Sequence, residues 1–195
     1  SDIPYGAQSF FDSARNCEYE VVRLFLISGI NPDLRDENGE TALMSAVKNG
    51  AFTLATLSLN YGADIDARRD DGKTALHLAV INEQTEMVRL LLEDGANANV
   101  GDARGITPLM RAAKKGPSRI AEYLLRGGSD VDAQDDDGRT ALIFASQEGD
   151  IESVEMLLAA GADPTIRAAD GTARDYARRA RFFEIAHMLE KAEAE

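Results

Sequence analysis

Glycine recurs at a fixed interval along this chain, and this interval constrains the fold more than any other feature of the sequence. One series of glycines has a spacing of 33 residues, and a second series has the same spacing in register with the first. A period of this length predicts a solenoid in which each repeat packs only against its neighbours. The first series is Gly39, Gly72, Gly105, Gly138 and Gly171, and the second is Gly29, Gly62, Gly95, Gly128 and Gly161.

The residues that follow the first glycine series predict a turn that leads into a helix. After Gly72 the chain reads Lys73-Thr74-Ala75-Leu76, and a threonine stands at the same place in the neighbouring repeats. Glycine supplies the positive φ of a tight turn, and threonine can cap the helix with its hydroxyl. Small residues then recur where neighbouring helices would approach closely, at Ala46, Ala79, Ala112 and Ala145.

A second helix is predicted before each glycine of the second series. Apolar residues four positions apart define one face of this helix. The glycine would end the helix in the left-handed conformation, and the Asn or Asp two positions later suits an Asx turn. The apolar pairs are Val22 and Leu26, Ala55 and Leu59, Val88 and Leu92, Ala121 and Leu125, and Val154 and Leu158, and the Asx residues are Asn31, Asp64, Asn97, Asp130 and Asp163.

This arrangement resembles the ankyrin repeat over essentially the whole chain, and its best single stretch is Asp71-Gly72-Lys73-Thr74-Ala75-Leu76-His77-Leu78-Ala79. The resemblance implies an all-α solenoid whose unit is two antiparallel helices and a β-hairpin finger. We therefore expect a single domain of six helix pairs over residues 1–195. Four pairs are regular repeats and two are caps: 36–68, 69–101, 102–134 and 135–167, flanked by 1–35 and 168–195.

Both ends depart from the pattern as the caps of a solenoid should. At the start, Gln8-Ser9-Phe10 replaces the Thr-Ala-Leu of the inner repeats. After Gly171 the match needs a deletion of one residue, which places Leu189 and Glu190 on two leucines of the preceding repeat. Arg174 also replaces the usual leucine of the first helix, so the last pair is expected to present charge where inner repeats present core.

Acidic residues outnumber basic residues by 34 to 21, and the formal net charge is −13. This charge opposes binding to phosphate backbones and anionic membranes, so neither nucleic acid nor a membrane is expected as a partner. The single cysteine, Cys17, allows no disulfide within these residues and fits a reducing compartment, which favours a cytoplasmic location. The chain is long enough to bury a core without a disulfide or a structural metal. We expect it to be a monomer.

The residues that could act as nucleophile or base are better explained by the repeat. His77 lies in the Thr-Ala-Leu-His stretch, where the resemblance implies a structural histidine, and the only other histidine is in the last helix. Cys17 occupies the register of Gly50, Gly116 and Gly149 at the end of a first helix. We expect no catalytic residue and no enzyme activity.

The acidic run of residues 130–138 superficially suggests a calcium site. With Gly138 at the sixth position of an EF-hand loop, Phe144 would occupy the position of the bidentate glutamate, so that motif is absent. The run is expected to be a solvated finger, or otherwise an acidic patch that meets a basic partner. No turn glycine begins a phosphate-binding loop. We expect neither a metal nor a cofactor.

Recognition is expected at positions that differ between repeats, because the constant positions build the stack. The resemblance places these positions at the loop tips and at the ends of the first helices. Ile81 and Ile106 are apolar at predicted exposed positions, with Met44 and Met110 near them, which is typical of an interface core. The predicted partner-binding residues are Lys48, Asp70, Asp71, Lys73, Ile81, Arg104, Ile106, Met110, Arg111, Lys114, Lys115, Asp136, Asp137, Arg139 and Phe144.

The sequence therefore predicts a non-catalytic module that binds a protein partner through the concave groove and the finger tips. Its role would be that of an adaptor, a scaffold or an inhibitor, acting by a rigid, pre-formed surface. The alternative is a targeting or regulatory ankyrin domain of a larger enzyme or effector protein. The length of the native gene product would separate the two.

Overall fold

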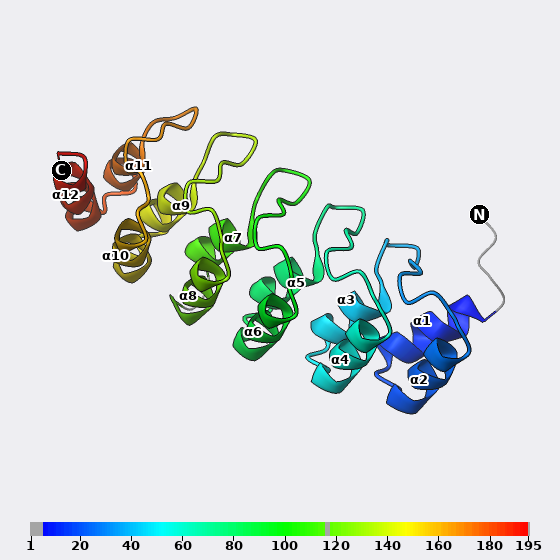
Figure 1. Ribbon diagram of the computed structural model, residues 1–195. Helices are drawn as coiled ribbons and strands as arrows, with labels where there is room; N and C mark the ends of the chain where they lie inside the picture. The colour runs from blue at the N-terminus through cyan, green and yellow to red at the C-terminus, as the bar shows by residue number, and fades with distance from the viewer. Residues whose placement is uncertain (1–5, 116–117, 195) are drawn as a thin grey trace. The chain divides into compact units, whose positions relative to one another are not determined.

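The computed structural model describes residues 6–115 and 118–194, and for Lys115 and Ser118 it describes the backbone alone. Within these ranges the chain forms twelve α-helices, with short loops inside each helix pair and longer loops between pairs (Figure 1). They are α1 (Ala7–Arg15), α2 (Tyr19–Ile27), α3 (Ala42–Lys48), α4 (Phe52–Asn60), α5 (Ala75–Ile81), α6 (Thr85–Glu93), α7 (Pro108–Lys115), α8 (Ser118–Arg126), α9 (Ala141–Glu148), α10 (Ile151–Ala159), α11 (Ala173–Arg179) and α12 (Phe183–Ala192). The chain divides into two compact units, residues 1–96 and 97–195. A single repeat domain over the whole chain stays a prediction.

In the first unit, the helices pack in consecutive pairs: α1 with α2, α3 with α4, and α5 with α6. The first helices of these pairs also pack side by side, α1 against α3 and α3 against α5 (Figure 1). Ala46 and Ala79 have no exposed surface, as the predicted close approach of these helices requires.

The second unit has the same plan, with pairs of α7 and α8, α9 and α10, and α11 and α12. Helix α9 packs against both α7 and α11, and α10 packs against both α8 and α12 (Figure 1). Ala112 and Ala145 are buried on the first helices. Helix α9 is therefore covered on two sides, and its side chains are held by packing.

Threonine caps the four inner first helices, as predicted. In each case the hydroxyl accepts a hydrogen bond from the backbone N–H three residues later, which satisfies a donor that has no partner inside the helix. The O–N distances are 3.3 Å for Thr41 and Met44, 3.5 Å for Thr74 and His77, 3.3 Å for Thr107 and Met110, and 3.4 Å for Thr140 and Ile143.

The two glycine series are needed for different reasons. Gly39 has a φ of 72°, and a Cβ there would lie 3.0 Å from the backbone nitrogen of Asp70 in the next loop. Gly105 has the same φ, and its Cβ would lie 3.1 Å from Cα of Asp135. In the second series, Gly62 has a φ of 80° and nothing within 4 Å of an added Cβ. Gly39 and Gly105 thus provide both the conformation and the space for the next loop, whereas Gly62 provides only the conformation.

The predicted Asx turns follow the second glycine series. The Oδ1 of Asn31, for example, accepts from the backbone N–H of Asp33 at 3.0 Å. Asp33 and its equivalents then link consecutive loops, because each side-chain oxygen accepts from the backbone N–H at the start of the next Asx turn. These inter-loop bonds join Asp33 to Asp64 at 2.7 Å, Asn99 to Asp130 at 2.7 Å, and Asp132 to Asp163 at 2.9 Å.

The predicted face of the second helix, Val22 and Leu26, is buried in α2, but in α6, α8 and α10 the buried face differs slightly from the predicted one. Val88 is fully buried as expected, but the leucine without exposed surface is Leu91 rather than Leu92, which is only half-buried. The buried face of the helix contains Val88 and Leu91, and Leu92, four residues after Val88, lies at its edge. Leu124 and Leu157 are likewise more buried than Leu125 and Leu158.

The described loops contain tight turns, and the β-hairpin fingers that the resemblance implies stay a prediction. In the loop before α7, Gly105 donates to the carbonyl of Asp102 and Asp102 donates to the carbonyl of Ile106, both at 2.9 Å. Within the described ranges, one isolated bridge, between Ala168 and Gly171, is the only β pairing. Two backbone bonds close a turn but do not make a strand ladder.

The last helix pair carries charge where inner repeats carry leucine, as predicted. Arg174 lies 3.6 Å from Glu190 and 3.1 Å from Glu193. Leu189 has no exposed surface. None of the described helices is long and apolar enough to cross a membrane, since the longest, α12, has 10 residues.

Candidate functional site

The ends of the first helices carry different side chains at equivalent positions, and these side chains are exposed. Lys48, Ile81, Lys114 and Gln147 occupy one register and are all exposed, whereas the alanines two positions earlier are buried. Ile81 is the apolar member, with 42% of its surface exposed, as predicted. The helix ends therefore present changing chemistry on a constant frame.

The first unit has a charged groove along these helix ends, which we call the first-unit groove. It consists of two adjoining cavities of about 250 and 330 Å³, both lined by Lys48. Glu40, only 5% exposed, accepts from Lys48 at 2.9 Å and from Arg69 at 2.8 Å. The lining residues are Arg15, Asp36, Asn38, Glu40, Ser45, Lys48 and Asn49 in one cavity, and Lys48, Arg69, Asp71, Lys73, Leu78, Ile81 and Asn82 in the other.

The other cations of the first-unit groove are also paired with carboxylates. Arg15 lies 2.5 Å from Asp36, and Lys73 lies 2.5 Å from Asp71. Burial disfavours the charged form of Asp36, but the hydrogen bonds from Arg15 and from two backbone N–H groups outweigh it, so the pKa of Asp36 is lowered. The pKa of Asp71 is lowered in the same way, with Lys73 outweighing the effect of burial. These acids stay ionised and neutralise their neighbours.

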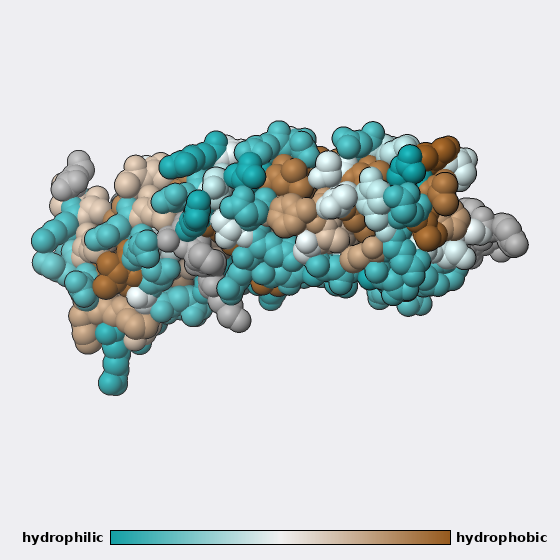
Figure 2. All heavy atoms as spheres, turned by 90° about the horizontal axis from the view of Figure 1, so that it is seen from below, coloured by the Kyte–Doolittle hydropathy of each residue, from teal (hydrophilic) through white to brown (hydrophobic). Residues whose placement is uncertain are grey.

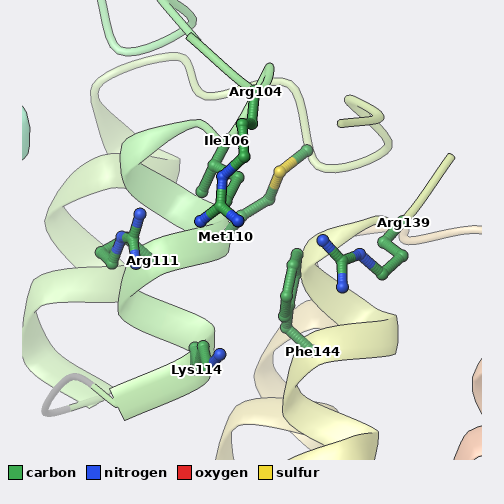
Figure 3. Close-up of a pocket in the computed structure, with 7 residues that line it drawn as sticks. All are labelled: Arg104, Ile106, Met110, Arg111, Lys114, Arg139 and Phe144. Atoms are coloured by element: carbon green, nitrogen blue, oxygen red, sulfur yellow. The ribbon is translucent and has the colours of Figure 1, made fainter. Parts of the chain in front are cut away.

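The second unit has a smaller cavity of about 90 Å³ between α7, α9 and the loops that precede them, which we call the second-unit pocket (Figure 3). Four cations surround a floor of two aliphatic side chains and one aromatic ring. Figure 3 shows the guanidinium groups of Arg104 and Arg139 approaching from the two loops, with the Phe144 ring standing between α7 and Arg139. The lining residues are Arg104, Ile106, Met110, Arg111, Lys114, Arg139 and Phe144.

Two of these cations are paired within the protein. Arg139 lies 2.8 Å from Asp135 and 3.0 Å from Asp137, and its hydrogen bond to Asp135 raises its pKa. It also stacks 4.7 Å from the centroid of the Phe144 ring. Arg111 lies 3.3 Å from Asp102.

The other two cations of the second-unit pocket form no ion pair with any residue that the structure describes. Arg104 and Lys114 are both exposed. Lys114 has its Nζ 5.9 Å from the centroid of Phe144, which is a cation–π contact and leaves the charge uncompensated. The Nε–H of Arg111 is buried and has no hydrogen-bond partner among the described residues. The pocket thus has donors available for an anion.

The prediction that Ile106 is exposed is wrong, because only 5% of its surface is accessible. Its N–H donates to Oδ1 of Asp102 at 3.2 Å, and its carbonyl accepts from Asp102 N–H, so the loop closes with the side chain turned inward. Met110 is 1% exposed because it sits at the helix start, where its sulfur accepts from Thr107 N–H at 3.5 Å. Met44, in the same register, is also 1% exposed, and Phe144 is 3% exposed.

The predicted partner-binding residues divide between the two units. Lys48, Asp70, Asp71, Lys73 and Ile81 belong to the first unit, and all except Asp70 line the first-unit groove. In the second unit, seven of the predicted residues line the second-unit pocket, while Asp136 and Asp137 are exposed on the loop beside it. The side chain of Lys115 and the whole of Gly116 lie outside the described residues.

Asp71 and Asp137 were among the predicted partner-binding residues, but four other acids that neutralise the cations were not. They are Asp36 and Glu40 in the first unit, and Asp102 and Asp135 in the second. Asp36, Asp102 and Asp135 share one register, three residues before a glycine of the first series. That register could have identified them, whereas Glu40 has no acidic equivalent.

The residues considered for chemistry have structural surroundings. His77 is fully buried, and its Nδ1 accepts from Thr74 N–H at 3.2 Å. Cys17 has a φ of 57°, close to the 65° of Gly50 at the equivalent helix end. No group of three or more His, Cys, Asp or Glu side chains in the described part of the chain could hold a metal ion.

A separate apolar area lies on α2. Val21, Leu24 and Ile27 are 40%, 61% and 53% exposed, and Figure 2 shows hydrophobic atoms gathered over this helix. This area is on a second helix and does not contribute to the groove.

Comparison with known proteins identifies the repeat. No curated protein matches the chain. A family model described as ankyrin repeats in three copies matches residues 10–102 and again residues 95–168, which together exceed half of the sequence. Members of this family generally mediate protein–protein interaction. The threonine caps, the glycine turns and the paired helices agree with this match, and the chain belongs to the ankyrin-repeat family.

Proposed function

We propose that this chain is a non-catalytic protein-binding module, an adaptor, scaffold or inhibitor, that acts through the ends of its first helices and the adjoining loops. One observation carries the proposal: Lys48, Ile81 and Gln147 are exposed in one register and differ in chemistry, while the alanines of the same helices are buried. A buried frame of constant residues can thus present a variable surface without a change of backbone. Such a pre-formed surface loses little conformational entropy when it binds.

The first-unit groove offers an anchor point for a protein partner. Ile81 is 42% exposed and lines a cavity of about 330 Å³ together with Leu78 and Asn82. Lys73 and Lys48 border the same cavity. An exposed apolar side chain inside a charged rim is the usual arrangement of an interface hot spot.

The same surface would serve a targeting or regulatory domain within a larger enzyme or effector protein. In both roles the partner would contact the helix ends, so both predict that Ile81 lies in the interface. The length of the native gene product distinguishes them.

The test is affinity capture from the source lysate with the full chain, identification by mass spectrometry, and calorimetric titration of each captured protein. Ile81→Ala should weaken binding by about tenfold or more, because it removes an anchor from the groove. The matched control is Ile27→Ala on α2, which removes the same side chain at 53% exposure outside the groove and should leave binding unchanged. Weakening by Ile27→Ala alone would place the interface on the second helices and contradict the proposal.

A further inference from the structure

Two lysines in equivalent positions have different surroundings in the two units. Lys48 and Lys114 lie two repeats apart in the same register, and Lys48 is 2.9 Å from Glu40. The residue equivalent to Glu40 in the second unit is Ile106. Lys114 therefore lacks the internal carboxylate that neutralises Lys48.

Several donors around the second-unit pocket have no acceptor among the described residues. Lys114 and Arg104 form no ion pair among the described residues, and both line the second-unit pocket. The buried Nε–H of Arg111, which has no hydrogen-bond partner in the described part of the chain, belongs to the same set. A buried donor without an acceptor is unfavourable, and an anion in the pocket would supply acceptors.

We infer that the second-unit pocket binds an aspartate or glutamate side chain of an acidic peptide segment. This inference rests on the proposed function, since the segment would belong to the protein partner. Arginine and lysine donate strong, charge-assisted hydrogen bonds to a carboxylate. The cavity of about 90 Å³ admits a group of that size, and Met110 and Phe144 provide an apolar floor for its stem.

The charges near the pocket favour a single carboxylate over a polyanion. Arg111 and Arg139 are already partly neutralised by Asp102 and Asp135, at 3.3 and 2.8 Å. Asp136 and Asp137 are exposed on the adjoining loop and would repel a continuous phosphate backbone. The net charge of −13 opposes nucleic acid and anionic lipid further.

The experiment selects binders from a phage-displayed library of random linear peptides on the full chain, and then measures the Kd of the selected peptides by fluorescence anisotropy. Aspartate and glutamate should be enriched, and peptides with glutamine in place of glutamate should bind at least about tenfold more weakly. The Arg104→Glu, Lys114→Glu double variant should raise Kd by at least about tenfold. Arg104→Gln with Lys114→Gln provides a milder second variant, and circular dichroism checks that each variant folds.

The matched control is the Arg119→Glu, Arg126→Glu double variant. It makes the same change in net charge at two exposed positions on α8 that do not line the pocket, so its Kd should change by less than about twofold. Equal losses in the control and the pocket variant would overturn the inference, because binding would then depend on net charge alone. Tighter binding of phosphoserine peptides, or displacement by heparin or by anionic vesicles, would also overturn it.

The two proposals fail in different ways. Selected peptides that carry no acidic residue and are weakened by Ile81→Ala would overturn the carboxylate pocket and support protein binding through the groove. A library that yields no binder, together with a capture experiment that yields no partner, would contradict both.

Discussion

The two units place cations at equivalent positions of the repeat but balance them differently. In the first unit, Glu40 neutralises Lys48 and Arg69 at 2.9 and 2.8 Å. In the second unit, Ile106 stands in the place of Glu40, and Lys114 has no carboxylate partner in the described part of the chain.

The backbone bonding at the position of Glu40 and Ile106 is alike in the two units, whereas the side chain differs. Glu40 and Ile106 are each 5% exposed, and each donates its N–H to an aspartate at the start of its loop, at 2.9 and 3.2 Å. The acid at this position in the first unit forms an ion pair with the nearby lysine, whereas the apolar residue in the second unit cannot form one. In these two units, the residue at this loop position differs together with the pairing of the lysine at the exposed helix end.

The second-unit pocket contains Phe144 of α9, and α9 packs against α11, so the pocket should depend on the last helix pair. Removal of residues 170–195 should test this most severely, because Leu142, Val154 and Leu157 are at most 1% exposed and would lose their cover. Each such side chain contributes about 1.5–3 kcal/mol when buried, so we expect residues 140–160 to unfold or the chain to associate.

Hydrogen exchange on the truncated protein measures this effect. Amides near Ala46 and Ala79 in the first unit serve as an internal control and should stay protected. Undiminished protection across residues 140–160 in a monomer would show that α11 and α12 are dispensable for the second-unit pocket.

Glu40→Gln tests how much the ion pairs of Glu40 contribute to the stability of the protein. The variant removes the charge that pairs with Lys48 and Arg69, and we expect the free energy of unfolding to fall by about 1.5–3 kcal/mol. Chemical denaturation measures the change. The matched control is Glu86→Gln, which removes an ion pair between Arg89 and the exposed Glu86 and should leave the free energy of unfolding nearly unchanged. Equal losses would mean that Glu40 contributes no more than a surface ion pair.

Ile106→Glu tests whether Lys114 binds the peptide because position 106 carries no charge, and we expect the smallest effect of the three variants. The new carboxylate should pair with Lys114 as Glu40 pairs with Lys48, and it should weaken the binding of acidic peptides by about tenfold, or about 1.4 kcal/mol. In the control Ile106→Gln, the glutamine has nearly the shape of glutamate but no charge, so this variant should bind the peptide much more tightly than Ile106→Glu. Equal Kd values for the two variants, measured by fluorescence anisotropy, would show that Lys114 does not contact the peptide.

Most of the fold could be predicted because the repeat determines it locally. The positive φ of Gly39 and the cap at Thr74 each depend on residues within a few positions in the sequence. The burial of Leu91 rather than Leu92 could not be predicted, because a spacing of three and a spacing of four both fit one helical face. The packing of the neighbouring helices makes that choice.

The candidate site was harder to predict than the fold. The exposure of Ile81 follows from its place at a helix end, but Ile106 looks equally exposed from its place beside a glycine. Its inward position results from the bonds between its backbone and Asp102. The pairing of Arg69 with Glu40 joins residues 29 positions apart, and no local pattern indicates it.

The inter-loop bonds limit how a gene for this protein can change in length. The bonds of Asp33 to Asp64, Asn99 to Asp130 and Asp132 to Asp163 each join residues 31 positions apart. Duplication or loss of a whole 33-residue segment by recombination gives every such side chain an equivalent partner in the next loop. An insertion of one codon within an Asx turn or an intervening helix would shift the acceptor away from its N–H group, whereas an exposed loop tip can accommodate it, so these bonds restrict where the repeat can change in length.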